Sequence, residues 1–453
     1  MTLNKTADAS LYEQLYIGIK QAIVRGEILP ETKLPSKRQL AEFLSISQTT
    51  VELAYGQLLD EGYISSKPRI GFFVEDIAEL AYVSQPEQPM ASQPASPLIQ
   101  YDFSPGKIDE EAFPFKIWRK IAKDVYDDSY KHLLQTGHRQ GEFALRQEIA
   151  QYLYASRGIV CSAEQIVIGS GTEQLLPMIL NLFENNAQLA VENPGYSPLT
   201  SRQAIPIPVD EDGLMVEALA QTEANIVYIT PSHQFPTGAV LSAARRVQLL
   251  SWANAKPERY IIEDDYDSEF RYKGKPIPAL QGMDRHDKVI YLSTFTKSLM
   301  PSLRVAYFVL PKSLLHVYKE RLTFYSSTVP RFDQQILTRF MQEGHFAKHL
   351  NRMRKIYRKK HDKIVSLLEQ YPAIHVSGDV AGMHILISVD TNCTEQQLLK
   401  KAEAAHIRIY PLSNYMYETT HFAQPTFLIG FGGIPFQELE IAIAQLLQVL
   451  LPK

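Results

Sequence analysis

The sequence predicts a two-part α/β protein, in which a small helical unit ending in a hairpin precedes a large body built on a sheet with helices on both faces. Three observations lead to this fold class. The first 75 residues show helical periodicity with capping signals. A stretch rich in Ser, Gln, Pro and Ala follows, and short β-rich runs then alternate with helical segments from about residue 100 onward. The length of 453 residues also exceeds what one compact core holds.

Three helices are predicted in the N-terminal unit, each from a capping signal at its start. Ser10 and Glu13 have capping-box spacing, Ser36 and Gln39 repeat it, and Ser47 can cap a third helix. The apolar residues expected on the buried faces are, helix by helix, Leu11, Leu15, Ile19 and Ile23; Leu40, Phe43 and Leu44; and Val51, Ala54, Tyr55 and Leu58.

A short hairpin with a basic tip is expected after the third helix, which Gly62 ends. Residues 63–64 and 71–74 flank the tip, 66–69. The stretch that follows lacks helical or strand periodicity and is typical of a linker. The predicted boundaries are therefore 1–76 for the first domain, 77–99 for a flexible linker and 100–453 for the body.

The body contains several runs of β-branched and aromatic residues that predict strands between helical segments. No internal repeat with a period of 20–50 residues is visible. This alternation favours a largely parallel sheet covered on both faces. The predicted strands are 165–169, 225–229, 260–262, 289–292 and 305–309.

Composition is that of an ordinary soluble globular protein and excludes several classes. Hydrophobic residues make up 45% and charged residues 21%, and the apolar runs are too short to cross a bilayer. No signal peptide is visible, and the cysteines, Cys161 and Cys393, form neither a disulfide framework nor a zinc motif. His233 and His345 lack partners at metal spacing. The expectation is a cytoplasmic protein without a metal site.

The N-terminal unit has the pattern of a domain that reads DNA, because a helix pair joined by a short turn places its second helix in the major groove. Residues 1–76 hold five Lys and three Arg against ten acidic residues, so DNA contact must rest on local clusters. The first turn of the third helix can contact bases, and the start of the second helix and the hairpin tip can contact phosphates. The residues expected at DNA are Lys37, Arg38, Gln48, Thr49, Thr50, Lys67 and Arg69.

Segments 34–41, 49–51 and 58–64 closely resemble the winged helix of GntR-type transcription regulators, and the resemblance covers essentially the first 75 residues. It implies double-stranded operator DNA as a partner. That family usually has Arg where Gln48 stands and Gly where Arg69 stands, so its base preference does not carry over. The alternative is a winged helix used for protein contacts, with the hairpin tip merely solvated.

Four features of the body together favour a pyridoxal phosphate (PLP) site. A hydroxyl-rich loop with Thr296 and Lys297 follows a predicted strand, and Arg304 comes soon after it. Residues 261–266 end another strand in acids and a tyrosine, so a carboxylate there can hold the pyridine nitrogen protonated. Residues 169–173 can bind phosphate at a helix N-terminus, and the tyrosine at 196 can stack on the ring. Each feature alone is more often a surface lysine, a solvated acidic loop or a turn; their co-occurrence predicts the site.

From about residue 100 onward the chain is similar to fold-type-I aminotransferases, with a smaller subdomain at about 346–453. Fused to a GntR-type winged helix, this body resembles the MocR subfamily of regulators, most specifically over residues 230–238 and 263–272. The resemblance implies that such chains form head-to-tail homodimers in which each winged helix lies over the partner's body.

The same resemblance assigns roles to the cofactor residues. Lys297 forms the Schiff base with PLP, and Asp264 rather than Asp265 pairs with the pyridine nitrogen. The remaining roles it implies are a hydrogen bond to the ring oxygen, phosphate binding and ring stacking, by Tyr266, by Arg304 with Thr172 and the adjacent Gly171, and by Tyr196.

Three departures favour a sensor over a working aminotransferase. Phe235 stands where aminotransferases of this fold usually have an Asn that contacts the ring oxygen. The late strand at 426–431 lacks the usual Arg for a substrate carboxylate, and Thr136 replaces the Tyr that reaches the phosphate across the dimer. Losing an Arg–carboxylate clamp removes roughly 1.5–3 kcal/mol. The rival interpretation is an active aminotransferase, and residual half-transamination is compatible with the sensor.

The missing arginines also bear on the signal. Relatives that sense γ-aminobutyrate hold its carboxylate with arginines at positions where this chain has Leu428 and Pro198. PLP itself is therefore the leading candidate signal, which resembles the PdxR branch that controls PLP (vitamin B6) synthesis genes. An amino acid or another amine, sensed through a Schiff base with the cofactor, is the alternative.

A run of basic residues between 348 and 363 stands outside both sites. Such a run is usually a solvated helix face. The alternative is that it supplies phosphate contacts that the acidic N-terminal domain lacks.

Overall fold

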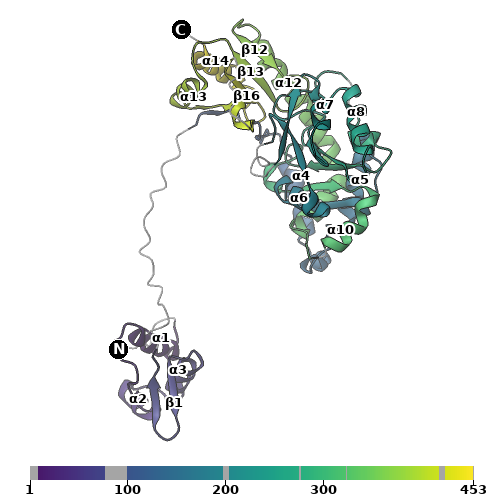
Figure 1. The fold of residues 1–453 in the computed structure, drawn as a ribbon. Helices are drawn as coiled ribbons and strands as arrows, with labels where there is room; N and C mark the ends of the chain where they lie inside the picture. The colour runs from purple at the N-terminus through teal and green to yellow at the C-terminus, as the bar shows by residue number, and fades with distance from the viewer. Residues whose placement is uncertain are drawn as a thin grey trace. The chain divides into compact units, whose positions relative to one another are not determined.

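The computed structural model describes residues 9–76, 99–196, 204–274, 277–322, 324–417 and 424–451, without the side chains of 184–186. By internal contacts the chain divides into two compact units, residues 1–96 and 97–453. The predicted linker, apart from Ile99, and Pro198 lie outside the described residues. The two units are described separately below (Figure 1).

The N-terminal unit is a winged helix, as predicted. It comprises α1 (Leu11–Val24), α2 (Lys37–Leu44) and α3 (Gln48–Asp60), followed by the antiparallel pair β1 (Ile64–Lys67) and β2 (Gly71–Val74). Residues of all three helices and both strands share one hydrophobic core. The inward residues predicted for α3 are buried. The β1 strand extends to Lys67, so the wing is a tighter hairpin than expected.

The capping predictions are confirmed for two of the three helices. Ser36 and Gln39 form a full capping box at α2, and the Ser47 hydroxyl accepts from the Thr50 backbone N–H at α3. Ser10 precedes α1 with extended backbone, but its side chain makes no capping hydrogen bond, so that capping box is wrong. Phe43, expected inside, is 83% exposed, because α2 turns Ala41 toward the core instead.

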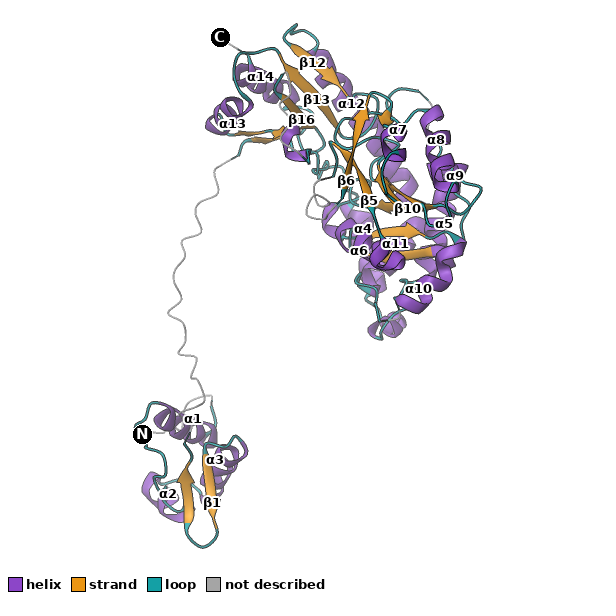
Figure 2. Ribbon diagram, in the orientation of Figure 1, coloured by secondary structure: helices purple, strands orange, loops and turns teal. Residues whose placement is uncertain are grey.

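The body is built on an eight-stranded sheet formed by the described residues (Figure 2). Five central neighbours, β10-β9-β8-β5-β6, run parallel, and β11, β4 and β7 pair antiparallel at the two sides. All five predicted strands are present. In spatial order the strands are β4 (Ile166–Gly169), β11 (Ala306–Val309), β10 (Val289–Thr294), β9 (Tyr260–Asp265), β8 (Ile226–Ile229), β5 (Leu189–Asn193), β6 (Ile205–Asp210) and β7 (Gly213–Leu214).

Helices cover both faces of this sheet, which confirms the predicted fold class. Alternate strand residues face opposite ways, so Ile261 packs with the α7 and α8 side chains while Ile262 packs with those of α6 and α10. The face of Tyr291 and Tyr307 packs against α4, α5 and α11. The helices are α4 (Phe115–Val125), α5 (Phe143–Arg157), α6 (Thr172–Leu180), α7 (Val216–Ala220), α8 (Ala243–Asn254), α9 (Leu280–Met283), α10 (Leu315–Arg321) and α11 (Arg331–Gln342).

A smaller subdomain follows, on a four-stranded sheet of order β12-β13-β16-β15 among the described residues. A short strand from the start of the body, β3 (Tyr101–Asp102), pairs in parallel with β14 (Ile407–Arg408) of this subdomain. Its other elements are α12 (His345–Leu368), β12 (Ile374–Ser377), β13 (His384–Val389), α13 (Glu395–Ala404), β15 (Tyr410–Pro411), β16 (Thr426–Gly430) and α14 (Leu439–Leu450).

The basic run lies on α12, and one of its members departs from the predicted solvated face. Lys360 is 1% exposed; its Nζ lies 2.8 Å from an Asp109 carboxylate oxygen and donates to the Gly432 carbonyl. It is therefore structural, whereas Lys348, Arg352, Lys355 and Lys359 are exposed. No helix within the described ranges is long and apolar enough to cross a membrane.

Candidate functional site

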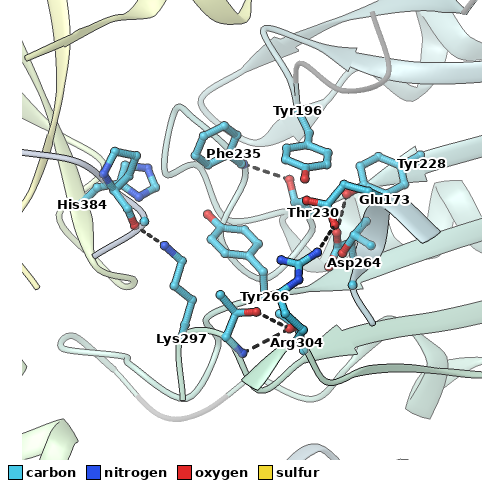
Figure 3. Close-up of a pocket in the computed structure, with 16 residues that line it drawn as sticks. Glu173, Tyr196, Tyr228, Thr230, Phe235, Asp264, Tyr266, Lys297, Arg304 and His384 are labelled. Atoms are coloured by element: carbon cyan, nitrogen blue, oxygen red, sulfur yellow. Dashed lines mark hydrogen bonds and ion pairs between the residues drawn. The ribbon is translucent and has the colours of Figure 1, made fainter. Parts of the chain in front are cut away.

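A pocket in the body brings together all eight residues expected to bind the cofactor (Figure 3). It lies where strands β8, β9 and β10 end, at the turn from β4 into α6. Carboxyl ends of parallel strands share one edge of a sheet, and ligands bind outside that edge. The eight residues are Gly171, Thr172, Tyr196, Asp264, Tyr266, Thr296, Lys297 and Arg304.

Strand alternation decides which of three consecutive acids at the end of β9 faces the pocket. Asp264 points to the same side as Ile262, toward α6. Asp265 points to the opposite face, where one of its carboxylate oxygens lies 2.7 Å from the Arg157 guanidinium. Glu263 accepts from the backbone N–H groups of Leu280 and Gln281 at the start of α9. Asp264 is therefore the carboxylate placed for a ligand.

Asp264 has one oxygen engaged and one oriented for a partner. The Tyr228 hydroxyl donates to Oδ2, while Oδ1 is buried with no hydrogen-bond partner among the described residues. Burial raises the pKa of Asp264 to about 7, and the Tyr228 hydrogen bond opposes that effect. A pyridinium N–H would satisfy Oδ1 and favour the charged carboxylate.

Lys297 and Tyr266 lie at the other side of the pocket. The Lys297 Nζ donates to the Pro105 carbonyl, and burial lowers the pKa of its ammonium to about 8, so a substantial share of the neutral, nucleophilic amine is present near neutral pH. The Tyr266 hydroxyl lies 3.0 Å from Nδ1 of His233, which a carboxylate of Asp267 also contacts at 3.0 Å. These contacts fix the phenol at the pocket wall.

The phosphate-binding features meet at the N-terminus of α6. Gly171, with φ of +146°, directs the chain into the helix, and Arg304 lies over it in a left-handed turn. The Thr294 and Thr296 hydroxyls are hydrogen-bonded to each other at 2.7 Å. Exposed helix N–H groups, hydroxyls and a guanidinium form an anion site. Glu173 shares this site and forms an ion pair with Arg304 at 2.9 Å.

Several lining residues were not predicted from the sequence. Tyr228 and Thr230 end β8, so the strand-edge argument that found Lys297 could have found them. His384 comes from β13 of the smaller subdomain, and no local pattern signals it. The buried groups His233, Asp267 and His384 lie close enough to hold a metal ion. Nε2 of His384 is 3.1 Å from the Pro236 carbonyl, and the absence of a metal site stays a prediction.

These residues fit PLP. The unpartnered Asp264 oxygen meets the need of a pyridine nitrogen, the α6 terminus with Arg304 that of a phosphate, and Lys297 that of an aldehyde. Tyr196, whose ring is 6.5 Å from that of Tyr228, provides an aromatic wall. When bound, PLP supplies an aldehyde carbon that condenses with an amine and a ring that withdraws electrons from it.

Comparison with known proteins agrees with this site and with the winged helix. Residues 100–428 match the aminotransferase class I and II family, and residues 11–74 match the bacterial regulatory proteins of the gntR family. The HTH-type transcriptional regulator YdeL of Bacillus subtilis is 43% identical, over 98% of this chain and 97% of its own length. The probable rhizopine catabolism regulatory protein MocR of Rhizobium meliloti is 31% identical, over 96% and 92%. The chain belongs to the MocR subfamily of GntR-type transcription regulators.

Two further relatives place this regulator between its neighbours. The HTH-type pyridoxine biosynthesis transcriptional regulator PdxR of Corynebacterium glutamicum is 29% identical over 98% of this chain and 97% of its own length. An archaeal alanine:glyoxylate aminotransferase has the same fold as the body, with a TM-score of 0.71 and 23% identity over 79% of this chain and 91% of that one. PLP is thus the cofactor, and the winged helix is a DNA-binding domain.

In the winged helix, the residues expected at DNA differ in how available they are. Gln48 and Thr49 are exposed on the first turn of α3, whereas the Thr50 hydroxyl is hydrogen-bonded to that of Ser47. Lys37 forms an ion pair with Glu52, and Arg38 with Glu42. In the wing, Lys67 lies over the Phe73 ring, and Arg69 adopts a φ of +64° at the tip. That left-handed conformation explains why glycine suits this position in the family.

The buried Asp264 gives a stability prediction for the PLP-free regulator. Because its pKa is raised to about 7, the folded chain holds this proton more tightly than the unfolded chain, so stability falls as pH rises from about 4 to about 7. Asp264→Asn keeps the shape and removes the titration. Above pH 8 the variant should be the more stable protein by up to about 4 kcal/mol, since each pKa unit corresponds to about 1.4 kcal/mol.

The measurement is the melting temperature of PLP-free wild type and variant between pH 4 and 8. The difference should grow with pH, and exposed Glu320→Gln on α10 should show no such trend. A difference that is constant with pH would contradict the buried-carboxylate interpretation. With PLP present, Asp264→Asn should bind the cofactor more weakly, because the partner of the pyridine nitrogen is lost.

Proposed function

We propose that this regulator senses PLP itself and controls genes for PLP synthesis. The observation that carries the proposal is the apolar wall of the pocket on the substrate side. Among the described residues that line the pocket, Arg304 at the phosphate end is the single arginine. A carboxylate-bearing effector would therefore lack the guanidinium clamp that aminotransferases provide.

This wall is formed where the smaller subdomain meets the loop after β8. Leu428 on β16 is fully buried and packs with Leu386 and Leu412, and Phe235, Tyr410 and Tyr415 complete the cluster. The Phe235 ring also lies 5.0 Å from that of Tyr415 and 5.5 Å from that of His384. A carboxylate placed against this cluster would be desolvated without a charged partner, which is unfavourable.

The neutral state of His384 supports the same conclusion. Burial lowers the pKa of its imidazolium to about 3, with a further contribution from His233, so it carries no charge that could replace the missing arginine. The similarity to PdxR, whose name refers to pyridoxine biosynthesis, supports PLP synthesis genes as the target.

We also propose that the aminotransferase-like body works as a sensor and not as a working aminotransferase. Loss of a carboxylate clamp weakens substrate positioning, and Phe235 leaves Tyr266 without the Asn that usually assists it at the ring oxygen. The residues that hold PLP are nevertheless complete, so slow half-transamination of an amine is compatible with this role.

For PLP to act as a signal, its binding must differ in free energy between two arrangements of the winged helices. We propose that a head-to-tail homodimer provides these arrangements, with each winged helix over the partner's body. PLP and operator DNA then affect each other's affinity by the same factor.

This linkage gives a direct prediction. An operator fragment is first selected by the full-length protein from a random duplex library. Its dissociation constant should then change roughly 5–150-fold between PLP-free and PLP-saturated protein, which corresponds to about 1–3 kcal/mol of coupling. Reciprocally, saturating operator should shift PLP affinity by the same factor, measured by absorbance titration.

The competing functions give different outcomes in the same assay. If PLP leaves DNA affinity and footprint unchanged and γ-aminobutyrate or another amino acid then shifts them, PLP is a cofactor and the amine is the signal. Rapid, multiple-turnover transamination of a common amino acid would instead identify a working aminotransferase.

A further inference from the structure

Glu173 is an acidic residue at the point where this pocket receives an anion. It stands in the first turn of α6, the helix whose N-terminus faces the phosphate end. One of its carboxylate oxygens accepts a hydrogen bond from the Arg304 guanidinium at 2.9 Å (Figure 3). The cation expected to hold the cofactor phosphate is thus already paired with a side chain of the same chain.

The position of this ion pair is defined by Gly171. A Cβ atom added to Gly171 would lie 2.4 Å from Nη2 of Arg304 and 2.6 Å from Oε2 of Glu173. The pair therefore lies directly against the glycine backbone at the start of α6, within the space that the missing side chain leaves open. An anion bound by this turn would have to use the same space.

The Glu173 carboxylate also uses the other donors of the site. Burial raises the pKa of Glu173, but its own backbone N–H, the Arg304 guanidinium and the Tyr196 hydroxyl outweigh burial and hold it below its usual range. The group is therefore an anion at neutral pH. Helix N–H, guanidinium and hydroxyl are the donor types that a phosphate takes.

We propose that Glu173 is an internal competitor of the PLP phosphate: its carboxylate occupies the phosphate donors of the unliganded chain and sets the affinity for PLP. This proposal deepens the proposed PLP sensing and rests on it for its biological meaning. A sensor must be partly empty at physiological ligand concentrations, because occupancy responds to concentration only near the dissociation constant. A competing carboxylate weakens binding without removing any donor.

The alternative for an acid in the first turn of a helix is a favourable interaction with the helix dipole. In that case Glu173 would affect stability slightly and PLP affinity little. The two interpretations differ in ligand selectivity, since a competitor for the phosphate site acts only on ligands that carry a phosphate.

The experiment compares PLP with pyridoxal, which lacks the phosphate, on the full-length protein. Glu173→Gln keeps the size of the side chain and removes its charge. The side chain is 54% exposed, so the fold is not at risk. Absorbance titrations should show PLP binding tightened at least fivefold and pyridoxal binding changed less than twofold. Inorganic phosphate should protect the variant from PLP at lower concentrations than it protects wild type.

Two variants complete the design. Glu320→Gln removes an exposed carboxylate from α10 and should leave both dissociation constants unchanged. Glu173→Asp keeps the charge but shortens the reach toward Arg304, so it should tighten PLP less than Glu173→Gln does. Unchanged or weaker PLP binding by Glu173→Gln, or an equal gain for pyridoxal, would overturn the proposal.

Failure of this proposal is distinguishable from failure of PLP sensing. If Glu173→Gln tightens PLP but PLP has no effect on operator affinity, Glu173 is the competitor and PLP is not the signal. If PLP shifts operator affinity equally in both proteins at the same PLP concentrations, sensing holds and Glu173 does not set its range.

Discussion

Replacing Lys297 by alanine should abolish the borohydride-sensitive absorbance of the purified, PLP-loaded protein while leaving the fold intact. Within the described part of the chain, Lys297 is the one lysine that lines the pocket. The pKa of its ammonium is lowered to about 8 by burial, so its amine is available for condensation near neutral pH. No second amine in that lining can replace it, and the expected loss of covalent cofactor is complete.

The fold should tolerate this change because the Lys297 side chain makes one hydrogen bond, to the Pro105 carbonyl, and no ion pair with the groups described. The measurement is the absorbance spectrum before and after borohydride, with circular dichroism as the check on folding. Lys312→Ala, at an exposed position after β11, should retain the wild-type spectrum. Retention of a reducible band by Lys297→Ala would move the covalent attachment elsewhere.

Much of the site could be predicted because its residues stand at strand ends. Lys297, Asp264 and Gly171 each follow or end a β-rich run, and parallel strands bring such ends to one edge. Local signals were equally reliable where one short-range interaction decides the structure, as for the Ser36 capping box and the Gly62 helix end. Ser10 shows the limit: the spacing is right, but its side chain makes no cap.

Long-range contacts explain what the sequence could not predict. His384 reaches the pocket from a separate subdomain, and the apolar cluster around Leu428 combines β13, β16 and the loop after β8. Lys360 has the sequence context of a surface lysine, and only the fold places Asp109 beside it. Glu173 fits an ordinary helix start, and its role depends on Arg304, 131 positions later.

Removing the exposed polar groups of α3 and the wing should eliminate operator-specific DNA binding. Gln48 and Thr49 stand on the first turn of the helix that enters the major groove, and both side chains are exposed. Each base contact contributes about 1–3 kcal/mol of discrimination, so Gln48→Ala with Thr49→Ala should weaken specific binding by roughly 30- to 10,000-fold. Thr50 is left intact because its hydroxyl is bonded to that of Ser47 at 2.7 Å.

Arg69→Ala tests the wing separately, since a phosphate contact acts on all sequences alike. It should weaken specific and non-specific binding together and lower the slope of log affinity against log salt by about 1. Arg25→Ala, which removes an exposed charge at the end of α1, is the matched control and should leave that slope unchanged. The measurement is fluorescence anisotropy of full-length variants on the selected operator and on a scrambled duplex, at several salt concentrations.

Specific binding that survives all three substitutions would exclude the winged helix as the reader of sequence. Attention would then turn to the exposed basic residues of α12, which offer phosphate contacts but no base-reading pattern. Substituting Lys348, Arg352, Lys355 and Lys359 in the wild-type background separates the two cases. If the winged helix reads the operator, these changes should lower affinity for operator and scrambled DNA by the same factor, and the ratio between the two should stay at its wild-type value.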